Sequence, residues 1–311
     1  MIFLFDGDIM RLRGRSKLAL ITFFVLLQRG MVRIKMKNLL LGHTNSYHGF
    51  SLEEALGGIA AAGFKYVEIN AVKGWTEHLR ADMSEKELGR VRNMLDGLGL
   101  EVIALSGHCN LMDGQRLDDF RLNIELAAKL GCKYIISSVG EAHFGEEEER
   151  NDGKLIESLK SLLPLLEKHN ITLAIETHGD DYGTGQSLVG VVLGVNSPLV
   201  GINFDTANCF FWGGVQPMDD IKTCVQDVKF VHLKDKIGPQ KEWNFPGAGN
   251  GELPLRELIK FMTENGYQGP YSVEIEYTEK FCMREKDRPG DIDIANGEMA
   301  DSFKFLSSIF A

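Results

Sequence analysis

The chain has 311 residues, 44% of them hydrophobic and 25% charged, which is enough apolar sequence to bury a core without disulfide or metal staples. Its formal net charge is −10, so it offers no general basic face to nucleic-acid phosphates. The five cysteines are scattered and form no CxxC pair, which argues against a disulfide framework or a thiolate zinc site. We therefore expect a protein with reduced thiols, cytoplasmic, and with no nucleic-acid partner.

The first 36 residues predict an extension outside the folded core. Basic residues precede an apolar run at residues 18–27, as in a signal peptide, but no small-x-small cleavage site follows. The run is shorter than the roughly 20 residues that span a bilayer. We interpret residues 1–36 as an upstream extension before a natural start at Met31 or Met36, and we expect no membrane partner. The catalytic domain then covers residues 37–311.

From residue 39 onward, short apolar runs alternate with longer amphipathic stretches. The apolar runs predict strands at residues 39–42, 66–71, 101–106, 134–139, 171–176, 200–205, 229–233 and 271–276. The amphipathic stretches predict helices near residues 51–62, 83–98, 115–130, 152–169, 186–194, 217–226, 253–265 and 292–309. This alternation is typical of βαβ crossovers and a parallel sheet. Eight such units in about 270 residues predict a single α/β domain, a (β/α)8 TIM barrel.

Local signals agree with these helices. Ser51 precedes Glu54 at the spacing of a capping box, and Gly63 and Gly131 stand where a C-terminal cap belongs. A doubly wound open sheet is the alternative fold. It would need a glycine fingerprint after the first strand, and the sequence that follows Gly42 has none.

Strand periodicity places a set of polar side chains inside the predicted barrel. Side chains alternate between the helix layer and the barrel interior. In the fifth strand, Leu173 and Ile175 suit the helix layer, which leaves Glu176 inside. The same count places three further residues inside, at the ends of the sixth, seventh and eighth strands: Asp205, His232 and Glu274.

Charged groups that meet inside a barrel would repel one another or change protonation unless something neutralised them. A divalent cation does so, and three carboxylates with one imidazole suit Mn²⁺, Mg²⁺, Co²⁺ or Zn²⁺. We therefore predict one divalent metal ion held by Glu176, Asp205, His232 and Glu274. Taken singly, each residue has a plainer explanation; Asp205, for example, could cap the next helix. Glu276 is the rival of Glu274, since both face inward.

Several segments carry a resemblance to a known family. They are IETHGDDYGTGQSL, GINFDTANCFFWGG, KFVHLKD, WNFPGAGNGEL and GYQGPYSVEIE, in this order along the second half of the barrel, with GFKYVEIN as a looser match in the first half. The chain resembles the sugar phosphate isomerase/epimerase family of the xylose isomerase-like TIM barrel superfamily. The resemblance implies the same four metal ligands and prefers Glu274 to Glu276. It also makes a homo-oligomer possible.

Further residues are candidates for substrate binding. His108 follows the third strand, His178 lies two residues beyond Glu176, and Lys234 shares a face with His232. To these we add two residues of the later loops, Asn208 and Trp243; an aromatic residue such as Trp243 either covers a sugar face or simply packs. The glycine-rich loop at residues 246–251 precedes a helix, so its amides either bind a phosphate or belong to a mobile lid.

These features predict a metal-dependent isomerase or epimerase acting on a small sugar, sugar phosphate or polyol-ketone. The metal would polarise a carbonyl and stabilise an enediolate, while Glu176 and Glu274 act as catalytic proton carriers. Loss of a β-hydroxyl at the same site would give an inosose-type dehydratase instead. A multi-zinc AP endonuclease-like enzyme and a non-catalytic sugar-binding barrel are the remaining alternatives. The first would want more histidines than this sequence offers, for instance at Asn208.

Overall fold

The computed structural model describes residues 39–140, 150–276 and 291–310. The extension predicted at residues 1–36 lies outside the described residues. The strands are β1 (Leu40–His43), β2 (Tyr66–Asn70), β3 (Glu101–Ser106), β4 (Tyr134–Ser137), β5 (Thr172–Glu176), β6 (Val200–Asp205), β7 (Val228–Leu233) and β8 (Tyr271–Val273). The longer helices are α2 (Leu52–Ala62), α3 (Glu85–Leu98), α4 (Gly114–Leu130), α5 (Asp152–His169), α7 (Gly185–Val195), α9 (Pro217–Cys224), α10 (Leu255–Glu264) and α12 (Asp291–Phe310).

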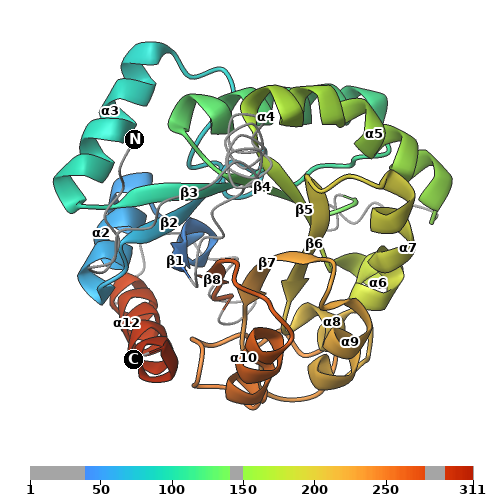
Figure 1. Ribbon diagram of the computed structural model, residues 1–311. Helices are drawn as coiled ribbons and strands as arrows, with labels where there is room; N and C mark the ends of the chain where they lie inside the picture. Colours follow the sequence, from blue (N-terminus) through green and yellow to red (C-terminus); the bar gives the residue numbers. More distant parts are fainter. Residues whose placement is uncertain (1–38, 141–149, 277–290, 311) are drawn as a thin grey trace, which may run out of the picture. The chain divides into compact units, whose positions relative to one another are not determined.

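The eight strands form a closed parallel barrel in the order β1 to β8. Each strand pairs with the next, and β1 closes the ring by pairing with β8, with Leu41 opposite Ser272. The helices lie outside this ring, and α12 packs beside α2 at the closure (Figure 1). The (β/α)8 barrel predicted from the alternation of strands and helices is therefore confirmed.

The main hydrophobic core lies between the strands and the surrounding helices. In β5, Leu173 and Ile175 belong to this core, as the alternation of side chains requires. Side chains that face the barrel interior make different contacts. Phe230 of β7 is fully buried and its ring lies 5.4 Å from that of Tyr134 in β4, a strand that is not its neighbour. This contact crosses the barrel, so the interior is filled by side chains beneath the polar ends of the strands.

Capping residues fix the ends of the first helices. Ser51 accepts a hydrogen bond from the backbone N–H of Glu54, whose carboxylate in turn accepts from the backbone N–H of Ser51, so the predicted capping box is present. Gly63 and Gly131 end α2 and α4 with φ of 107° and 79°. Glycine adopts this left-handed conformation without a steric penalty, which explains both positions.

The eighth strand is shorter than the sequence predicts, because it ends at Val273 rather than at residue 276. Beyond it, the backbone N–H of Ile275 donates to the hydroxyl of Ser46, and Glu276 pairs in antiparallel fashion with Phe245. Apolar alternation continues through this segment. The backbone N–H of Glu274 still donates to Leu233 of β7, but those of Ile275 and Glu276 go to Ser46 and Phe245, outside the strands.

Three short helices among the described residues were also not predicted from the sequence. They are η1 (Thr44–Tyr47), α6 (Gly179–Tyr182) and α8 (Asn208–Phe211), and each begins within three residues of the end of a strand. Four residues are too few to show a helical period, so periodicity could not find them. Among the described residues, no helix combines the length and apolarity that crossing a bilayer needs.

The capping box gives a direct test of how α2 begins. Replacing Ser51 by Ala removes the side-chain acceptor and should lower the free energy of unfolding by about 0.5–2 kcal/mol. Ser51→Thr keeps the hydroxyl and should stay close to wild type. Urea unfolding followed by circular dichroism measures both variants. Equal destabilisation by Thr and Ala would show that the hydroxyl does not cap the helix.

Candidate metal and substrate site

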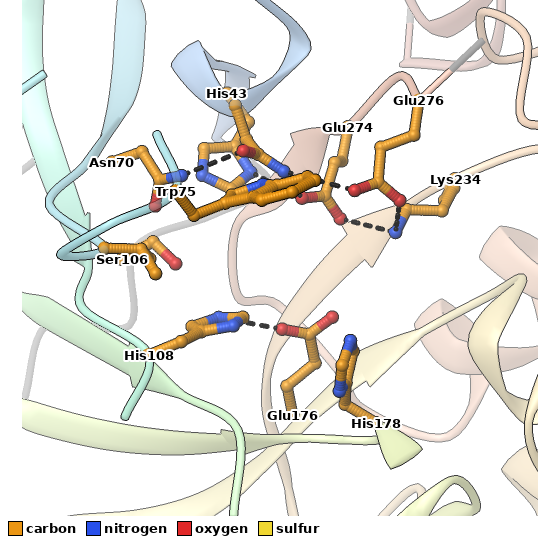
Figure 2. Close-up of a pocket in the computed structure, with 12 residues that line it drawn as sticks. His43, Asn70, Trp75, Ser106, His108, Glu176, His178, Lys234, Glu274 and Glu276 are labelled. Atoms are coloured by element: carbon orange, nitrogen blue, oxygen red, sulfur yellow. Dashed lines mark hydrogen bonds and ion pairs between the residues drawn. The ribbon is translucent and has the colours of Figure 1, made fainter. Parts of the chain in front are cut away.

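Polar side chains gather in a pocket at the carboxyl ends of the strands (Figure 2). Its lining residues come from several strands and the loops that follow them: His43, Asn45, Asn70, Val72, Trp75, Ser106, His108, Glu176, His178, Lys234, Glu274 and Glu276. In Figure 2, Glu274, Glu276 and Lys234 group together, apart from His108, Glu176 and His178. Barrel enzymes carry their chemistry at this end of the strands, so this pocket is the candidate site.

The structure brings together the four residues predicted to hold a metal. Glu176 ends β5, Asp205 ends β6, His232 lies in β7 and Glu274 follows β8. One ligand atom from each lies within 4.8 Å of the others, and all four residues are buried. The Nδ1 atom of His232 is 3.5 Å from Glu176 Oε1 and 3.4 Å from Glu274 Oε2.

The charges of this cluster fit a cation. Burial raises the pKa of Asp205 to about 7, and the neighbouring carboxylates add to that rise while Lys234 opposes it. Burial acts in the same direction on Glu176, but His232 and His108 outweigh it and hold the pKa of Glu176 well below its usual range. The carboxylates of Glu176 and Glu274 therefore stay charged because cationic groups surround them. Oxygen and imidazole donors this close together suit a divalent ion.

Hydrogen bonds orient three of these carboxylates. The amide of Asn208 donates to Glu176 Oε1 at 3.0 Å, and that of Asn45 donates to Glu274 Oε1 at 2.8 Å. Asp205 Oδ1 accepts the backbone N–H groups of Ala207 and Asn208, each at 2.8 Å. Asp205 thus accepts backbone N–H groups at the start of the short helix α8, close to the plainer explanation, although the N-cap residue itself is Ala207. The other oxygen of Asp205, Oδ2, is 3.2 Å from the Lys234 ammonium, so these hydrogen bonds leave that oxygen directed into the cluster.

Three of the predicted substrate-binding residues line the pocket. His108 Nε2 is 2.9 Å from Glu176 Oε2, and the rings of His108 and His178 are 6.2 Å apart. Burial lowers the pKa of His178 to about 4, so its imidazole is neutral at physiological pH. Lys234 Nζ lies 2.9 Å from both Glu274 Oε2 and Glu276 Oε2. All three residues line the pocket, and their contact with a substrate stays a prediction.

The other two predicted substrate-binding residues lie elsewhere. Asn208 is buried behind Glu176 and donates to it, outside the pocket lining. Trp243 packs edge-on against Phe211 and Phe245, with ring centroids 5.5 Å and 5.1 Å away. These positions suit a role in orienting Glu176 and in packing, respectively. Direct contact with a substrate stays a prediction for both.

Glu276 differs from its rival Glu274 in its surroundings. Both line the pocket, but Glu274 belongs to the four-residue cluster and Glu276 does not. Burial raises the pKa of Glu276, opposed by the ammonium of Lys234 at 2.9 Å. This arrangement favours Glu274 as the ligand and leaves Glu276 facing the space that a substrate would occupy.

Sequence reasoning overlooked several residues of the site. Glu68 of β2 is fully buried and lies 3.1 Å from His232, and Asn70 at the end of β2 lines the pocket. Counting alternate residues along the second strand would have placed both inside. Asn45 and Trp75 also line the pocket, but they lie outside the strands, where no alternation indicates direction.

The glycine-rich loop at residues 246–251 does not offer its amides to a ligand. The carboxylate of Asp235 accepts the backbone N–H groups of Gly249 and Gly251 at 2.9 and 3.0 Å. Glu298 accepts that of Gly247 at 2.7 Å. The idea that this loop binds a phosphate is therefore wrong, because carboxylates of the chain itself already occupy these donors.

Comparison with known proteins places the chain among its relatives. It is 25% identical to an inosose dehydratase of Clostridium botulinum (strain Eklund 17B / Type B) over 209 residues, 62% of this chain and 63% of the relative. The match thus spans less than two thirds of that relative's length.

Solved structures share the fold. A D-psicose 3-epimerase, solved in the presence of D-fructose, superposes with a TM-score of 0.70 at 16% identity, covering 88% of this chain and 99% of the other. The IOLI protein with a bound zinc atom gives a TM-score of 0.68 at 19% identity, covering 88% and 98%. The family described as Xylose isomerase-like TIM barrel matches residues 57–308, most of the chain. The chain therefore belongs to the xylose isomerase-like TIM barrel family.

Proposed function

We propose that the chain is a divalent-metal-dependent isomerase or epimerase that moves a proton on a carbon next to a carbonyl of a small polyhydroxy substrate. The observation that carries this proposal is the convergence of Glu176, Asp205, His232 and Glu274, with ligand atoms within 4.8 Å of one another. These four residues would hold the ion. When bound, a divalent ion supplies Lewis-acid polarisation of a carbonyl oxygen. The zinc atom in the structurally similar IOLI protein supports a metal in this fold.

Glu176 and Glu274 are the proposed proton carriers. They reach the site from β5 and from the segment after β8, so they can face a substrate carbon from two directions. His108 at 2.9 Å stabilises the Glu176 carboxylate, and Lys234 at 2.9 Å stabilises that of Glu274. If one glutamate removes a proton and the other returns it to the opposite face, the product is an epimer. Return of the proton to the neighbouring carbon gives isomerisation.

The surroundings favour an uncharged substrate. The pocket lining includes Glu176, Glu274 and Glu276, and the Lys234 ammonium is already engaged by carboxylates. The glycine-rich loop has its amides occupied. Trp75 supplies an apolar wall. A free sugar or polyol-ketone therefore suits this pocket better than a sugar phosphate.

A dehydratase is the second candidate, favoured by the similarity to an inosose dehydratase. The same glutamate would remove the proton beside the carbonyl, and a β-hydroxyl would leave as water after taking a proton from an acid in the pocket. Burial raises the pKa of Glu276, which faces the pocket and suits this acid role. The net reaction is loss of one water molecule, with no oxidant or reductant.

Proton exchange tests the catalytic assignment. With Mn²⁺ and a panel of free ketoses and inososes in D2O, the wild-type chain should exchange a substrate C–H proton, as followed by NMR. Glu176→Gln and Glu274→Gln should each lower this rate by about 10²–10⁴-fold, because each removes a proton carrier. Glu264→Gln serves as the control, because it changes an exposed carboxylate at the end of α10. Wild-type exchange rates in both site variants would refute the mechanism.

Chelation tests the metal, and the products separate the two candidates. Exhaustive dialysis against EDTA should abolish turnover, and Mn²⁺ should restore it, because the polarising cation is lost and regained. An epimer or an aldose–ketose pair supports the first candidate, whereas a product lighter by one water supports the dehydratase. Full turnover by protein shown to be metal-free by mass spectrometry would exclude metal dependence.

A further inference from the structure

Glu68 is a carboxylate that the proposed mechanism does not use. It lies in β2, exposes none of its surface and is not among the residues that line the pocket. A buried carboxylate is costly unless it is paired and hydrogen-bonded. Its partners therefore indicate what it does.

Glu68 forms hydrogen bonds with His232. Both carboxylate oxygens of Glu68 lie 3.1 Å from Nε2 of His232. Nε2 of His43 is farther away, 3.7 Å from Oε1. Strands β2 and β7 are not neighbours in the ring, so this contact crosses the barrel interior and holds the imidazole in one orientation. An ionised carboxylate can only accept, so Nε2 of His232 must be the donor and carry the hydrogen.

The opposite nitrogen of the same ring faces the proposed metal ligands. Nδ1 of His232 is 3.5 Å from Glu176 Oε1 and 3.4 Å from Glu274 Oε2. A ring nitrogen binds a metal only through a free lone pair, so the hydrogen must stay on the other nitrogen. We propose that Glu68 is a positioning residue that keeps the hydrogen on Nε2 of His232 and thereby presents Nδ1 to the divalent ion. This inference rests on the metal dependence proposed above.

Glu68 acts through His232 and is not itself a ligand. It contacts the nitrogen that points away from Glu176 and Glu274, and it does not belong to the four-residue cluster. Carboxylates that orient a metal-bound histidine in this way contribute about 10–100-fold to metal affinity. The effect of losing Glu68 should therefore appear in metal binding, with no substrate present.

Calorimetric titration of the full chain with Zn²⁺ tests the proposal. Glu68→Gln has nearly the same shape but no charge, and should weaken binding by about 10–100-fold. Glu68→Asp keeps the charge and should recover part of the affinity. Asp220→Asn is the matched control, since Asp220 is a buried carboxylate that accepts from the backbone of Gly185 and Gln186, away from the cluster. It should lower the melting temperature without changing metal affinity.

A second measurement locates the hydrogen. In zinc-loaded protein carrying ¹⁵N-labelled histidine, the ring signals that disappear in His232→Gln should show zinc on Nδ1 and hydrogen on Nε2. Zinc on Nε2, or wild-type affinity in Glu68→Gln, would overturn the proposal. If Glu68→Gln does not fold, the Glu68→Asp affinity and the wild-type NMR signals still decide it. A wild-type chain that binds no divalent ion would instead refute the proposed function.

Discussion

The site depends on the electrostatic cost of placing several carboxylates together inside a closed barrel. Those buried at or beneath the carboxyl ends of the strands include Glu68, Glu176, Asp205, Glu274 and Glu276. In a water-poor interior, such groups stay charged only next to cations. Lys234 supplies part of this charge. The proposed divalent ion would supply the rest, which links the function of the site to its electrostatic stability.

The barrel separates stability from chemistry. Apolar side chains such as Leu173 and Ile175 pack between strands and helices and form the main core. The residues that face the barrel interior at the carboxyl ends of the strands can then be polar, because the core does not depend on them. Loops and short helices complete the site. The side-chain amide of Asn45 in η1 donates to Glu274 and Glu276, and that of Asn208 in α8 donates to Glu176.

Much of this arrangement could be predicted from the sequence. Alternation of strands and helices predicted the barrel, and alternation of side chains along the strands brought Glu176, Asp205, His232 and Glu274 together. Both patterns can be read from residues close together in the sequence. Closure of the barrel then brings the ends of the strands, and the residues on them, to one site. The same count applied to β2 would have found Glu68.

Other features had no local signal. The end of β8 at Val273 depends on hydrogen bonds from the following residues to Ser46 and Phe245, which are distant in the sequence. The backbone amides of the glycine-rich loop are likewise occupied by hydrogen bonds to a residue outside the loop, Asp235. The packing of Trp243 against two aromatic rings also had no local signal, because loop residues take their direction from tertiary contacts.

A crystal structure of the chain grown with Zn²⁺, with anomalous diffraction collected at the zinc edge, would locate the ion that the four proposed ligand residues hold. We expect one zinc peak about 2.0–2.2 Å from carboxylate oxygens of Glu176, Asp205 and Glu274 and from Nδ1 of His232. A strong zinc peak elsewhere in the molecule, with these four side chains binding no ion, would contradict it.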